Sequence, residues 1–541
     1  MSLRFSRALT LAALLLLPLF AGAAPRIFYT DIINGPKTGG LNNLGAFLTI
    51  FGAGFGATQG TSTVTINNAA VGAVIQWSDA KITVQPGPAV STGAVKVTVG
   101  GAGSNTDQIF TVNSANIYFV SLTGSDAPGA GAVNDITKPF RNIQNVLDNK
   151  IAPGGAGGHV VIRGGTWSDN FSRFDSFFSI VDQSGTVASP IVVMGYPTET
   201  VTFLQTVQGK GFHSFNTAGH YVIANLHLNA NSHGINISIA PGLTDVRIAN
   251  NEVMNFLEDG GGAAVIDGSG TNFRILGNFL HNNGGSKLYH AIYFDGRAGT
   301  SGDMEIAYNT IANQIGGRGV QIFSDTATVI TNVRVHHNLI HDISLDGIHF
   351  ADNTGAGFQA YDNVVYNTDN PALRGPFTDT GDSGGCMRFV SSVLVALVYN
   401  NTFSNCNMGG SPDSGGIRFQ KAISITLINN IVNGKYFVNL DGLPLTPLSA
   451  PNNLWFGGGA APPFATNSQT GDPMFVSAAA GNFRLLAGSA AIDNGSAAVN
   501  SLVTTDFDGN PRPQGPAPDI GAFESSGVTL PTPANLKVIL Q

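Results

Sequence analysis

Three polar residues recur at a fixed spacing near the middle of the chain. Tyr293, Gln321 and His349 each stand at the centre of a short apolar run, and both intervals (321 − 293 and 349 − 321) are 28 residues. A phenol, an amide and an imidazole can donate and accept hydrogen bonds, and two of them can exchange protons. A period in this range is typical of a solenoid, in which each repeat forms one coil. The spacing therefore predicts a row of functional side chains along one face of a stack.

The row can be followed in both directions along the chain. Its predicted members are Asn236, Val265, Tyr293, Gln321, His349, Arg388 and Arg418. Stacked strands lie about 5 Å apart, which is close to the spacing of sugars in an extended glycan. The turns that enter these runs contribute His233, His290, Arg318 and Asp346. A loop from Asn367 to Gly385, with Asp369, Arg374, Asp379 and Asp382, is expected to wall one end of the row.

These residue types suit the elimination chemistry of a uronic acid. Such a reaction removes a proton beside a carboxylate, and it needs a base together with cations that stabilise the developing negative charge. The residues predicted to form the catalytic centre are Lys287, His290, Tyr293, Arg318 and His349. Those predicted to bind the substrate are Gln321, Asp295, Asp346, Arg388 and Arg418, with the arginines holding carboxylates bidentately.

Two other functions remain open from the residues. A glycoside hydrolase needs two carboxyl groups about 5 to 10 Å apart, and Asp295 with Asp346 is the pair that the row offers. Asp267 and Asp352 lie at equivalent ends, although a single turn aspartate usually has a structural role. A glycan-binding adhesin would instead present a flat or apolar row, so the mixture of Tyr, Gln, His and Arg favours an enzyme.

The elements that must carry this row are short strands. In residues 333–350, alternation places six apolar residues inward, two in each of three strands: Val333, Val335, Ile340, Ile343, Ile348 and Phe350. An asparagine recurs where the chain turns between the first two strands, because asparagine tolerates left-handed backbone angles and can bond along a stack. Its predicted positions are Asn225, Asn251, Asn278, Asn309, Asn338, Asn363, Asn401 and Asn430. Three strands per turn predict a right-handed parallel β-helix, and the histidines His336, His337 and His341 are expected to lie on its surface.

The N-terminal end of the chain indicates export. Arg4 and Arg7 precede an apolar run from Ala8 to Phe20 and small residues, which predicts a signal peptide over 1–23. That run is too short to span a bilayer, so we expect a soluble periplasmic or extracellular protein. The two cysteines, Cys386 and Cys406, either form a disulfide in that oxidising compartment or are two buried thiols.

Residues 25–113 resemble a known family of small domains. The runs LTIFGAGFG (48–56), VTINN (64–68), WSDAKITV (77–84), TGAVKVTV (92–99) and QIFTV (108–112) are similar to an IPT/TIG immunoglobulin-like β-sandwich. Domains of this family usually act as spacers or interaction modules, and in the adhesin alternative this one would be a stalk. The resemblance implies no catalytic residue here.

Residues 117–524 resemble secreted right-handed parallel β-helix proteins. The runs IYFVSLTGSD (117–126) and HVVIRGGTW (159–167) are similar to their N-terminal cap, with a short amphipathic helix expected over Thr137–Leu147. The runs GSAAIDNG (488–495), DFDGN (506–510) and DIGAFE (519–524) are similar to their closing segment, with Ala490 where the family usually has proline. The resemblance is to the β-helix polysaccharide lyases and glycoside hydrolases, and no family-specific catalytic signature accompanies it.

Composition limits the remaining partners and cofactors. The net charge is −8, and no cluster of Lys and Arg is present to neutralise phosphates, so nucleic acid is not expected as a partner. Asp506, Asp508, Asp519 and Glu524 are expected to cap turns, the alternative being a calcium site. The metal requirement and the cofactor are otherwise open. We expect a monomer that acts on a polysaccharide, with residues 525–541 as a tail.

Overall fold

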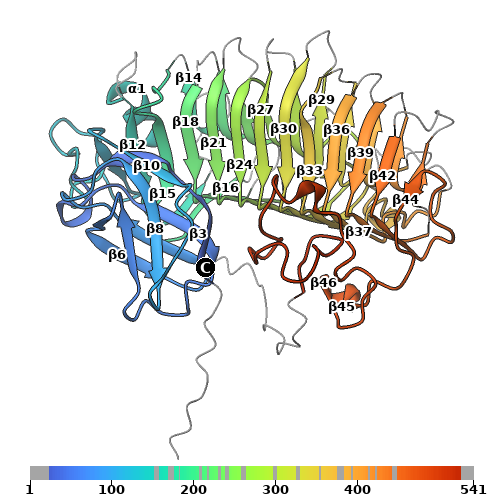
Figure 1. Ribbon diagram of the computed structural model, residues 1–541. Coiled ribbons are helices and arrows are strands. Elements are labelled where there is room, and N and C mark those ends of the chain that lie inside the picture. The colour runs from blue at the N-terminus through green and yellow to red at the C-terminus, as the bar shows by residue number, and fades with distance from the viewer. Residues whose placement is uncertain are drawn as a thin grey trace, which may run out of the picture.

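The computed structural model describes residues 24–151, 157–168, 176–181, 183–205, 210–215, 219–229, 233–237, 243–257, 264–296, 301–324, 329–352, 355–374, 383–390, 394–411, 415–420, 423–435, 437–440 and 448–525 (Figure 1). These residues form a small β-sandwich, a long three-sided stack of parallel strands, and a C-terminal segment that folds back beneath the stack. The predicted signal peptide and most of the predicted tail lie outside the described residues.

The sandwich consists of two sheets. One contains β1 (Arg26–Thr30), β3 (Leu48–Ala53), β7 (Lys81–Gln85) and β6 (Ala73–Trp77). The other contains β2 (Asn34–Pro36), β10 (Ile109–Asn113), β8 (Gly93–Val99), β4 (Thr63–Ile66), β5 (Ala69–Ala70) and β9 (Ala102–Gly103). The alternation that predicted these strands is seen in β8, where Val95 and Val97 are buried and Lys96 is partly exposed.

The stack has three long sheets, named here in the order in which each coil passes through them. The first sheet contains β11 (Ile117–Val120), β12 (Gly158–Ile162), β15 (Ile191–Gly195), β18 (Gly219–Ala224), β21 (Thr244–Ala249), β24 (Thr271–Leu276), β27 (Ser301–Ala307), β30 (Ile330–His336), β33 (Phe358–Tyr361), β36 (Leu394–Tyr399), β39 (Ile423–Ile428), β42 (Leu448–Pro451) and β44 (Ala465–Thr466). The second sheet contains β13 (Gly165–Ser168), β16 (Val201–Leu204), β19 (His227–Asn229), β22 (Glu252–Met254), β25 (Phe279–His281), β28 (Thr310–Gln314), β31 (Leu339–Ile343), β34 (Val364–Tyr366), β37 (Thr402–Ser404), β40 (Ile431–Asn433) and β43 (Leu454–Phe456). The third sheet contains β14 (Ser176–Val181), β17 (Lys210–Phe215), β20 (His233–Ile237), β23 (Ala264–Gly268), β26 (His290–Asp295), β29 (Val320–Phe323), β32 (Ile348–Ala351), β35 (Gly385–Val390), β38 (Gly415–Phe419) and β41 (Val438–Asn439).

Each strand pairs in parallel with its equivalent in the next coil, as β26 with β29 and β29 with β32. Parallel strands of one sheet that are joined by a crossover are connected with a right-handed turn. The chain is therefore a right-handed parallel β-helix preceded by a sandwich, and the predicted fold class is confirmed.

The interior of the helix follows the predicted alternation. The six residues predicted to point inward are all buried in one continuous apolar core: Val333, Val335, Ile340, Ile343, Ile348 and Phe350. Burying an aliphatic side chain of this size stabilises a fold by about 1.5–3 kcal/mol. Because every coil repeats the pattern, this burial makes the stack rigid enough to hold outward residues in register.

The asparagine column is confirmed, apart from its first member. From Asn278 to Asn430 each side-chain oxygen accepts from the backbone N–H and the side-chain amide of the preceding asparagine, as when Asn251 donates to Asn278 and Asn338 donates to Asn363. At the first coil this position is Leu226, whose N–H donates to Asn251. The prediction for Asn225 was wrong by one residue, because it belongs to an adjacent column of left-handed residues. The column also continues to Asn453.

The N-terminal cap contains a helix that is shorter than predicted. Helix α1 spans Ile143–Asn149, and the side chain of Asn142 accepts from the backbone N–H of Asn145 as its N-cap. The predicted start at Thr137 was wrong, because an asparagine cap is located five residues later. Ile143, Val146 and Leu147 are buried on one face, as the sequence predicted.

The sandwich packs against the outer face of the first sheet (Figure 1). One apolar cluster joins Phe47 and Ile50 of the sandwich to Phe119 and Val192 of the first sheet. The buried Arg247 of β21 donates to the carbonyl oxygens of Thr30 and Asp31, at 3.2 and 3.0 Å from Nε. The sandwich is therefore an integral cover of the helix, and not the stalk considered in the adhesin alternative.

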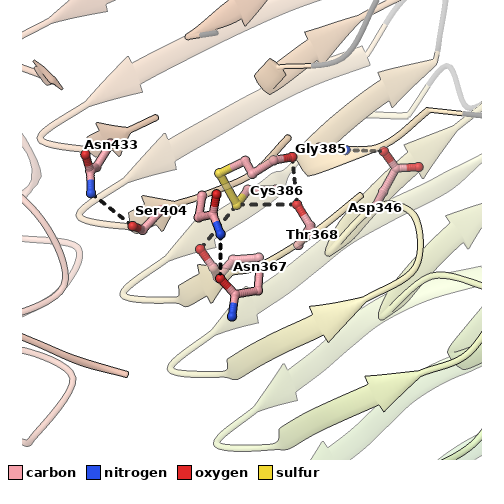
Figure 2. Close-up of a disulfide and its surroundings, with 10 residues drawn as sticks. Asp346, Asn367, Thr368, Gly385, Cys386, Ser404 and Asn433 are labelled. Atoms are coloured by element: carbon pink, nitrogen blue, oxygen red, sulfur yellow. Dashed lines mark hydrogen bonds between the residues drawn. A yellow bond between two sulfur atoms is a disulfide. The ribbon is translucent and has the colours of Figure 1, made fainter. Parts of the chain in front are cut away.

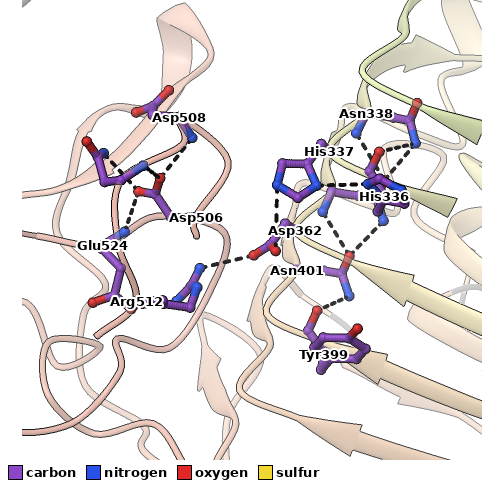
Figure 3. A network of polar contacts seen from close by, with 12 residues as sticks. His336, His337, Asn338, Asp362, Tyr399, Asn401, Asp506, Asp508, Arg512 and Glu524 are labelled. Carbon is purple, nitrogen blue, oxygen red and sulfur yellow. Dashed lines mark hydrogen bonds and ion pairs between the residues drawn. The ribbon is translucent and has the colours of Figure 1, made fainter. Parts of the chain in front are cut away.

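The C-terminal segment contains β45 (Phe475–Ser477) and β46 (Asn482–Leu485) and covers later coils on the first and second sheets. Short 3-10 helices lie at Leu41–Asn43, Pro371–Leu373, Ala478–Ala480 and Ala497–Val499. The buried Asp506 accepts from the backbone N–H groups of Asp508, Asn510 and Glu524 (Figure 3). Asp519 and Glu524 also accept from backbone N–H groups, as expected, whereas Asp508 pairs with Arg484 instead.

A buried charge network joins this segment to the helix. The guanidinium of Arg512 donates to Asp362 at 3.0 Å and to Glu524 at 2.7 Å, and all three are buried (Figure 3). Next to it, His336 and His337 are 5% and 6% exposed, with their Nδ1 atoms 3.0 Å apart. Their predicted place on the surface was wrong, because the C-terminal segment covers them. Among the described residues no helix is long and apolar enough to cross a membrane.

Candidate functional site

The predicted row exists on the outer face of the third sheet. Strand pairing aligns Tyr293 with Gln321, Gln321 with His349, His349 with Arg388, and Arg388 with Arg418. This register confirms that the repeat places the five residues one coil apart. Five central members of the row are thus neighbours along one line that runs parallel to the axis of the helix.

One predicted member of the row was wrong. Strand pairing places Asp267, and not Val265, between Asn236 and Tyr293. Val265 is buried in the core. The error arose from the unequal length of the turn before β23. Ile266 pairs with the buried residues Ile235 and Ile292 and is itself buried. The next residue, Asp267, therefore points outward and belongs to the row.

The register also extends the row beyond its predicted ends. Ser179 and His213 precede Asn236, and Asn439 follows Arg418. The side chains of His233 and Asn236 lie outside the described part of the chain, as do Asp379 and Asp382 of the predicted wall. The row thus changes along its length from an amide, an acid and a phenol to an imidazole and two guanidiniums.

The third sheet differs from the other two in what covers it. The described apolar clusters link the sandwich to the first sheet and the C-terminal segment to the first and second sheets. In the described part of the chain, no apolar cluster links either module to the outward row on the third sheet. Its outward polar residues are therefore the natural place for a ligand to bind.

A buried carboxylate holds two arginines beside the row. Asp346, in the turn before β32, is fully buried and accepts from Arg318 Nε at 2.8 Å. Arg388 Nη1 lies 3.5 Å from the same oxygen, and the backbone N–H of Gly385 donates to the other oxygen at 3.0 Å. Ionic hydrogen bonds of this kind fix the planes of both guanidiniums. Asp346 therefore positions cations, which differs from the substrate contact predicted for it.

His349 and Gln321 are bonded to each other and to this network. Nδ1 of His349 lies 3.2 Å from Oε1 of Gln321, and Arg318 Nη1 donates to the same oxygen at 3.2 Å. His349 is 6% exposed, and its Nε2 is buried with no hydrogen-bond partner. Burial, assisted by the nearby Arg318 and Arg388, holds the pKa of His349 well below its usual range. The imidazole is thus neutral near pH 7 with one nitrogen uncommitted.

His290, Tyr293 and Lys287 lie together at the rim two coils earlier. The backbone N–H of Arg318 donates to Nδ1 of His290 at 3.3 Å, and the rings of His290 and Tyr293 are 5.5 Å apart. Burial, with a contribution from Arg318, holds the pKa of His290 well below its usual range. Lys287 is partly exposed, and its carbonyl oxygen accepts from Arg318 Nη1 at 3.4 Å. Arg318 therefore contacts four predicted site residues: Lys287, His290, Gln321 and Asp346.

The last two arginines of the row each have a polar neighbour that sequence reasoning missed. Nε of Arg388 donates to Oε1 of Gln420 at 2.8 Å, and Nη1 of Arg418 donates to Oγ of Ser383 at 2.7 Å. Gln420 follows the end of β38, and Ser383 lies two residues before the start of β35. Their closeness to strands of the row was the available signal.

The two carboxylates of the hydrolase alternative lie in different surroundings. Asp346 is bound by two arginines and a backbone N–H. Asp295 is 3% exposed at the end of β26, in register with Phe323.

A disulfide fixes the strand that carries Arg388 (Figure 2). Cys386 of β35 bonds Cys406, which follows β37, and their Cα atoms are 4.9 Å apart. Both residues are buried in the core, and Thr368 donates to the carbonyl oxygen of Cys406 at 3.0 Å. The open question of whether the cysteines pair is thus answered. Figure 2 also shows Asp346 bonded to Gly385, directly before Cys386.

Asp369 anchors the base of the predicted wall. Its buried carboxylate accepts from Arg374 Nη2 at 2.6 Å and from the backbone N–H of Gly384 at 3.2 Å. The two ends of the loop are therefore tied together next to the disulfide. Among the described residues, no group of three His, Cys, Asp or Glu side chains could hold a metal ion.

A separate surface hollow lies at the corner between the first and second sheets of the earliest coils. Ser121, Thr137, Arg163 and Glu199 line it. Arg163 Nε donates to Glu199 at 2.8 Å, so these charges satisfy each other. The hollow is on another side of the helix from the row and shares no residue with it.

Comparison with known proteins supports the two-part organisation. Residues 31–112 match the family model of the IPT/TIG domain. A search of curated proteins found no significant match. Among solved structures, a pectate lyase, Pel9A, is 16% identical with a TM-score of 0.43, over 76% of this chain and 97% of that one.

Two other solved structures are similar over comparable lengths. XylC in complex with xylose is 12% identical with a TM-score of 0.43, over 75% of this chain and 98% of that one. The family 28 exopolygalacturonase of Yersinia enterocolitica is 12% identical with a TM-score of 0.29, over 83% and 98%. The chain thus consists of an N-terminal IPT/TIG domain followed by a right-handed parallel β-helix.

Proposed function

We propose that this protein is a secreted enzyme that cleaves an acidic, uronate-containing polysaccharide by β-elimination along the third sheet. In this proposal residues 1–23 are a signal peptide, residues 25–113 form the sandwich, and residues 117–524 form the helix. The mature protein acts as a monomer on a polymer substrate.

The observation that carries the proposal is the group formed by Arg318 at the rim with His349, Arg388 and Arg418 of the row. Three guanidiniums lie around a neutral imidazole, and one buried carboxylate, Asp346, holds two of them, Arg318 and Arg388. The side chains of Arg318 and Arg388 are each 15% exposed, so both reach the surface. This cationic surface suits the carboxylates of a polyanion, because guanidinium binds carboxylate in two parallel hydrogen bonds.

Elimination needs this combination of groups. Cations near the sugar carboxylate stabilise the negative charge that develops when the adjacent proton leaves. A neutral side chain with a free lone pair must accept that proton. Arg388 and Arg418 supply the first requirement, and His349 supplies the second, with Lys287 and Tyr293 as the other predicted members of the centre. The second candidate, a hydrolase, would need two carboxyl groups on either side of the bond, whereas Asp346 is occupied by Arg318 and Arg388.

The proposal is tested by incubating the protein with pectic, alginate and glycosaminoglycan polymers. We expect the ultraviolet absorbance of an unsaturated product to rise on one of them. New reducing ends without that absorbance would indicate the hydrolase, and neither signal on any polymer would indicate a binding protein.

Two variants locate the activity on the row. His349→Ala and Arg318→Ala should each lower turnover at least about tenfold, because each removes a polar group of the centre. His341→Ala is the matched control, since His341 lies on the second sheet and stacks on Tyr366. Full activity in both row variants, with circular dichroism unchanged, would place the site elsewhere.

A further inference from the structure

The hydrogen bonds around Arg318 determine which nitrogen carries the proton in two buried histidines. A guanidinium and a backbone N–H can only donate, whereas a neutral imidazole has one donor and one acceptor nitrogen. Arg318 contacts His349 through Gln321 and contacts His290 directly. Each contact therefore fixes a tautomer, and the catalytic role of these tautomers rests on the proposed function.

The tautomer of His349 follows from the orientation of Gln321. Arg318 Nη1 donates to the side chain of Gln321 at 3.2 Å, so the atom facing Arg318 must be the carbonyl oxygen Oε1 and not the amide nitrogen. His349 Nδ1 lies 3.2 Å from that same oxygen. Two acceptors cannot bond each other, so Nδ1 of His349 carries the hydrogen. The lone pair is then on Nε2, which is buried and has no partner, so a substrate must displace the side chains that cover this nitrogen in order to reach it.

The tautomer of His290 is the opposite one. The backbone N–H of Arg318 donates to its Nδ1 at 3.3 Å, so that nitrogen holds a lone pair. In the neutral ring the hydrogen is then on Nε2. Both rings are neutral because each is buried and faces cations: Arg318 acts on His290, and Arg318, Arg388 and Arg418 act on His349.

Asp346 keeps Arg318 in the required position. It accepts from Nε of Arg318 at 2.8 Å, and its other oxygen is held by the backbone N–H of Gly385. The side chain of Arg318 thus cannot rotate away from Gln321 without breaking its 2.8 Å ion pair with a buried carboxylate, which is costly. An outer residue that fixes an imidazole in this way is a common feature of acid–base sites.

We propose that Asp346, Arg318 and Gln321 are positioning residues that make His349 Nε2 the proton acceptor of the elimination and His290 Nε2–H a hydrogen-bond donor to the substrate. Gln321 then orients His349 and is not a substrate contact. In the reaction, the C–H bond beside the sugar carboxylate breaks and its proton goes to His349 Nε2. The electron pair forms the carbon–carbon double bond, the bond to the glycosidic oxygen breaks, and that oxygen takes a proton from water. The imidazolium of His349 then returns its proton to solvent.

The neutral His290 serves the oxygen on which negative charge develops. A neutral imidazole can polarise such an oxygen through its N–H, without carrying a charge of its own in the ground state. Its nearest ring in the row is Tyr293, at 5.5 Å. His349 therefore accepts the proton and His290 donates a hydrogen bond, and contacts of Arg318 fix the tautomer of both rings.

The first test reads the tautomers directly. In protein with ¹⁵N-labelled histidine, nuclear magnetic resonance at neutral pH should show His349 with a bare Nε2 and His290 with a bare Nδ1. The signals are assigned by their loss in His349→Gln and His290→Gln. An imidazolium, or a bare Nδ1 in His349, would overturn the proposal. This test does not depend on finding a substrate, so it can fail or succeed separately from the proposed function.

The second test uses substitutions of Gln321 on the polymer that is cleaved. Gln321→Leu removes the acceptor, and we expect kcat to fall about tenfold or more with KM nearly unchanged. Gln321→Glu keeps an acceptor for both Arg318 and His349, so activity should be largely retained, with the acid limb of the pH–rate profile moved to higher pH. Gln359→Leu, on the first sheet, is the matched control, because Gln359 accepts from Tyr399 away from the row.

The outcomes separate the roles. Loss in Gln321→Leu with rescue in Gln321→Glu supports the positioning role. A rise in KM alone in Gln321→Leu would return Gln321 to substrate binding and overturn it. The predicted tautomers together with an unchanged kcat in Gln321→Leu would show that another group accepts the proton.

Discussion

At the scale of single residues, the site depends on which charges are available to the substrate. Arg388 is held by Asp346 and Gln420 and is still 15% exposed at the surface. A guanidinium that is oriented in advance loses little freedom when a carboxylate binds. Arg388 is therefore expected to contribute more to substrate binding than a freely rotating cation such as a surface lysine.

Replacement of this arginine tests that expectation. Arg388→Ala should raise KM by roughly 10- to 100-fold, since a hydrogen bond to a charged group contributes about 1.5–3 kcal/mol. Steady-state kinetics on the cleaved polymer measures the change. Arg334→Ala is the control, because Arg334 lies on the first sheet and pairs with Glu305 at 3.5 Å. An equal KM in both variants would show that the substrate does not reach β35.

At the scale of elements, β35 is the strand most in need of support. It follows the long loop of the predicted wall, whose two ends are joined by the hydrogen bond from Gly384 to Asp369. After this loop, β35 must pair with β32 in the correct register. Two constraints act at its first residues, the hydrogen bond from Gly385 to Asp346 and the disulfide from Cys386 to Cys406. Both lie within four residues of Arg388, so order in this strand is coupled to the row.

Removal of the disulfide should be costly for that reason. The double variant Cys386→Ala/Cys406→Ala is expected to lose about 3 kcal/mol of unfolding free energy, the value typical of a closed loop of this length. Urea denaturation measures the loss, and hydrogen exchange should increase in the peptide covering 383–390. Unchanged exchange there would show that Asp346 and the neighbouring coils hold β35 alone.

At the scale of the whole molecule, three modules depend on one another. The sandwich and the C-terminal segment both pack on the first sheet, and they approach each other near Tyr308, which stacks on Phe28 at 5.2 Å and lies 5.0 Å from His337. Phe507 of the C-terminal segment stacks on that same histidine, at 6.3 Å. We therefore expect the modules to unfold together, and the third sheet to be the face that this arrangement leaves for function.

The buried acids of the C-terminal segment make its docking sensitive to pH. Burial, with the neighbouring Asp508, raises the pKa of Asp506 to about 7 from its ordinary value of 3.8. Ionisation of Asp506 in the folded state is thus unfavourable, and its contribution to stability is full below pH 3.8 and lost as pH rises through about 7. The variant Asp506→Asn cannot ionise.

The stability of Asp506→Asn relative to the parent should therefore increase between pH 4 and pH 7. The slope is at most about 1.4 kcal/mol per pH unit, and the difference should be constant above that range. Urea denaturation of both proteins at several pH values measures it. Subtracting the parent removes the opposing effect of the buried histidines, whose lowered pKa values weaken the fold at acid pH. A difference that does not vary with pH would contradict the raised pKa.

The sequence by itself determined the β-helix, its inward residues, its asparagine column and the alignment of Tyr293, Gln321 and His349. These features repeat in every coil, and alternation along a strand is a local property that a period of 28 residues makes visible. Where turns vary in length, as before β23, the same counting misplaced Val265, and it assigned Asn225 to the wrong one of two adjacent columns.

Only the tertiary structure decided how the row works. The contact of Asp346 with Arg318 and Arg388 joins residues 28 and 42 positions apart, and the pairing of Cys386 with Cys406 depends on how β35 returns from its loop. The burial of His336 and His337 depends on a segment that lies more than a hundred residues later. Such contacts follow from the stacking of coils and the docking of modules, and no spacing along the chain encodes them.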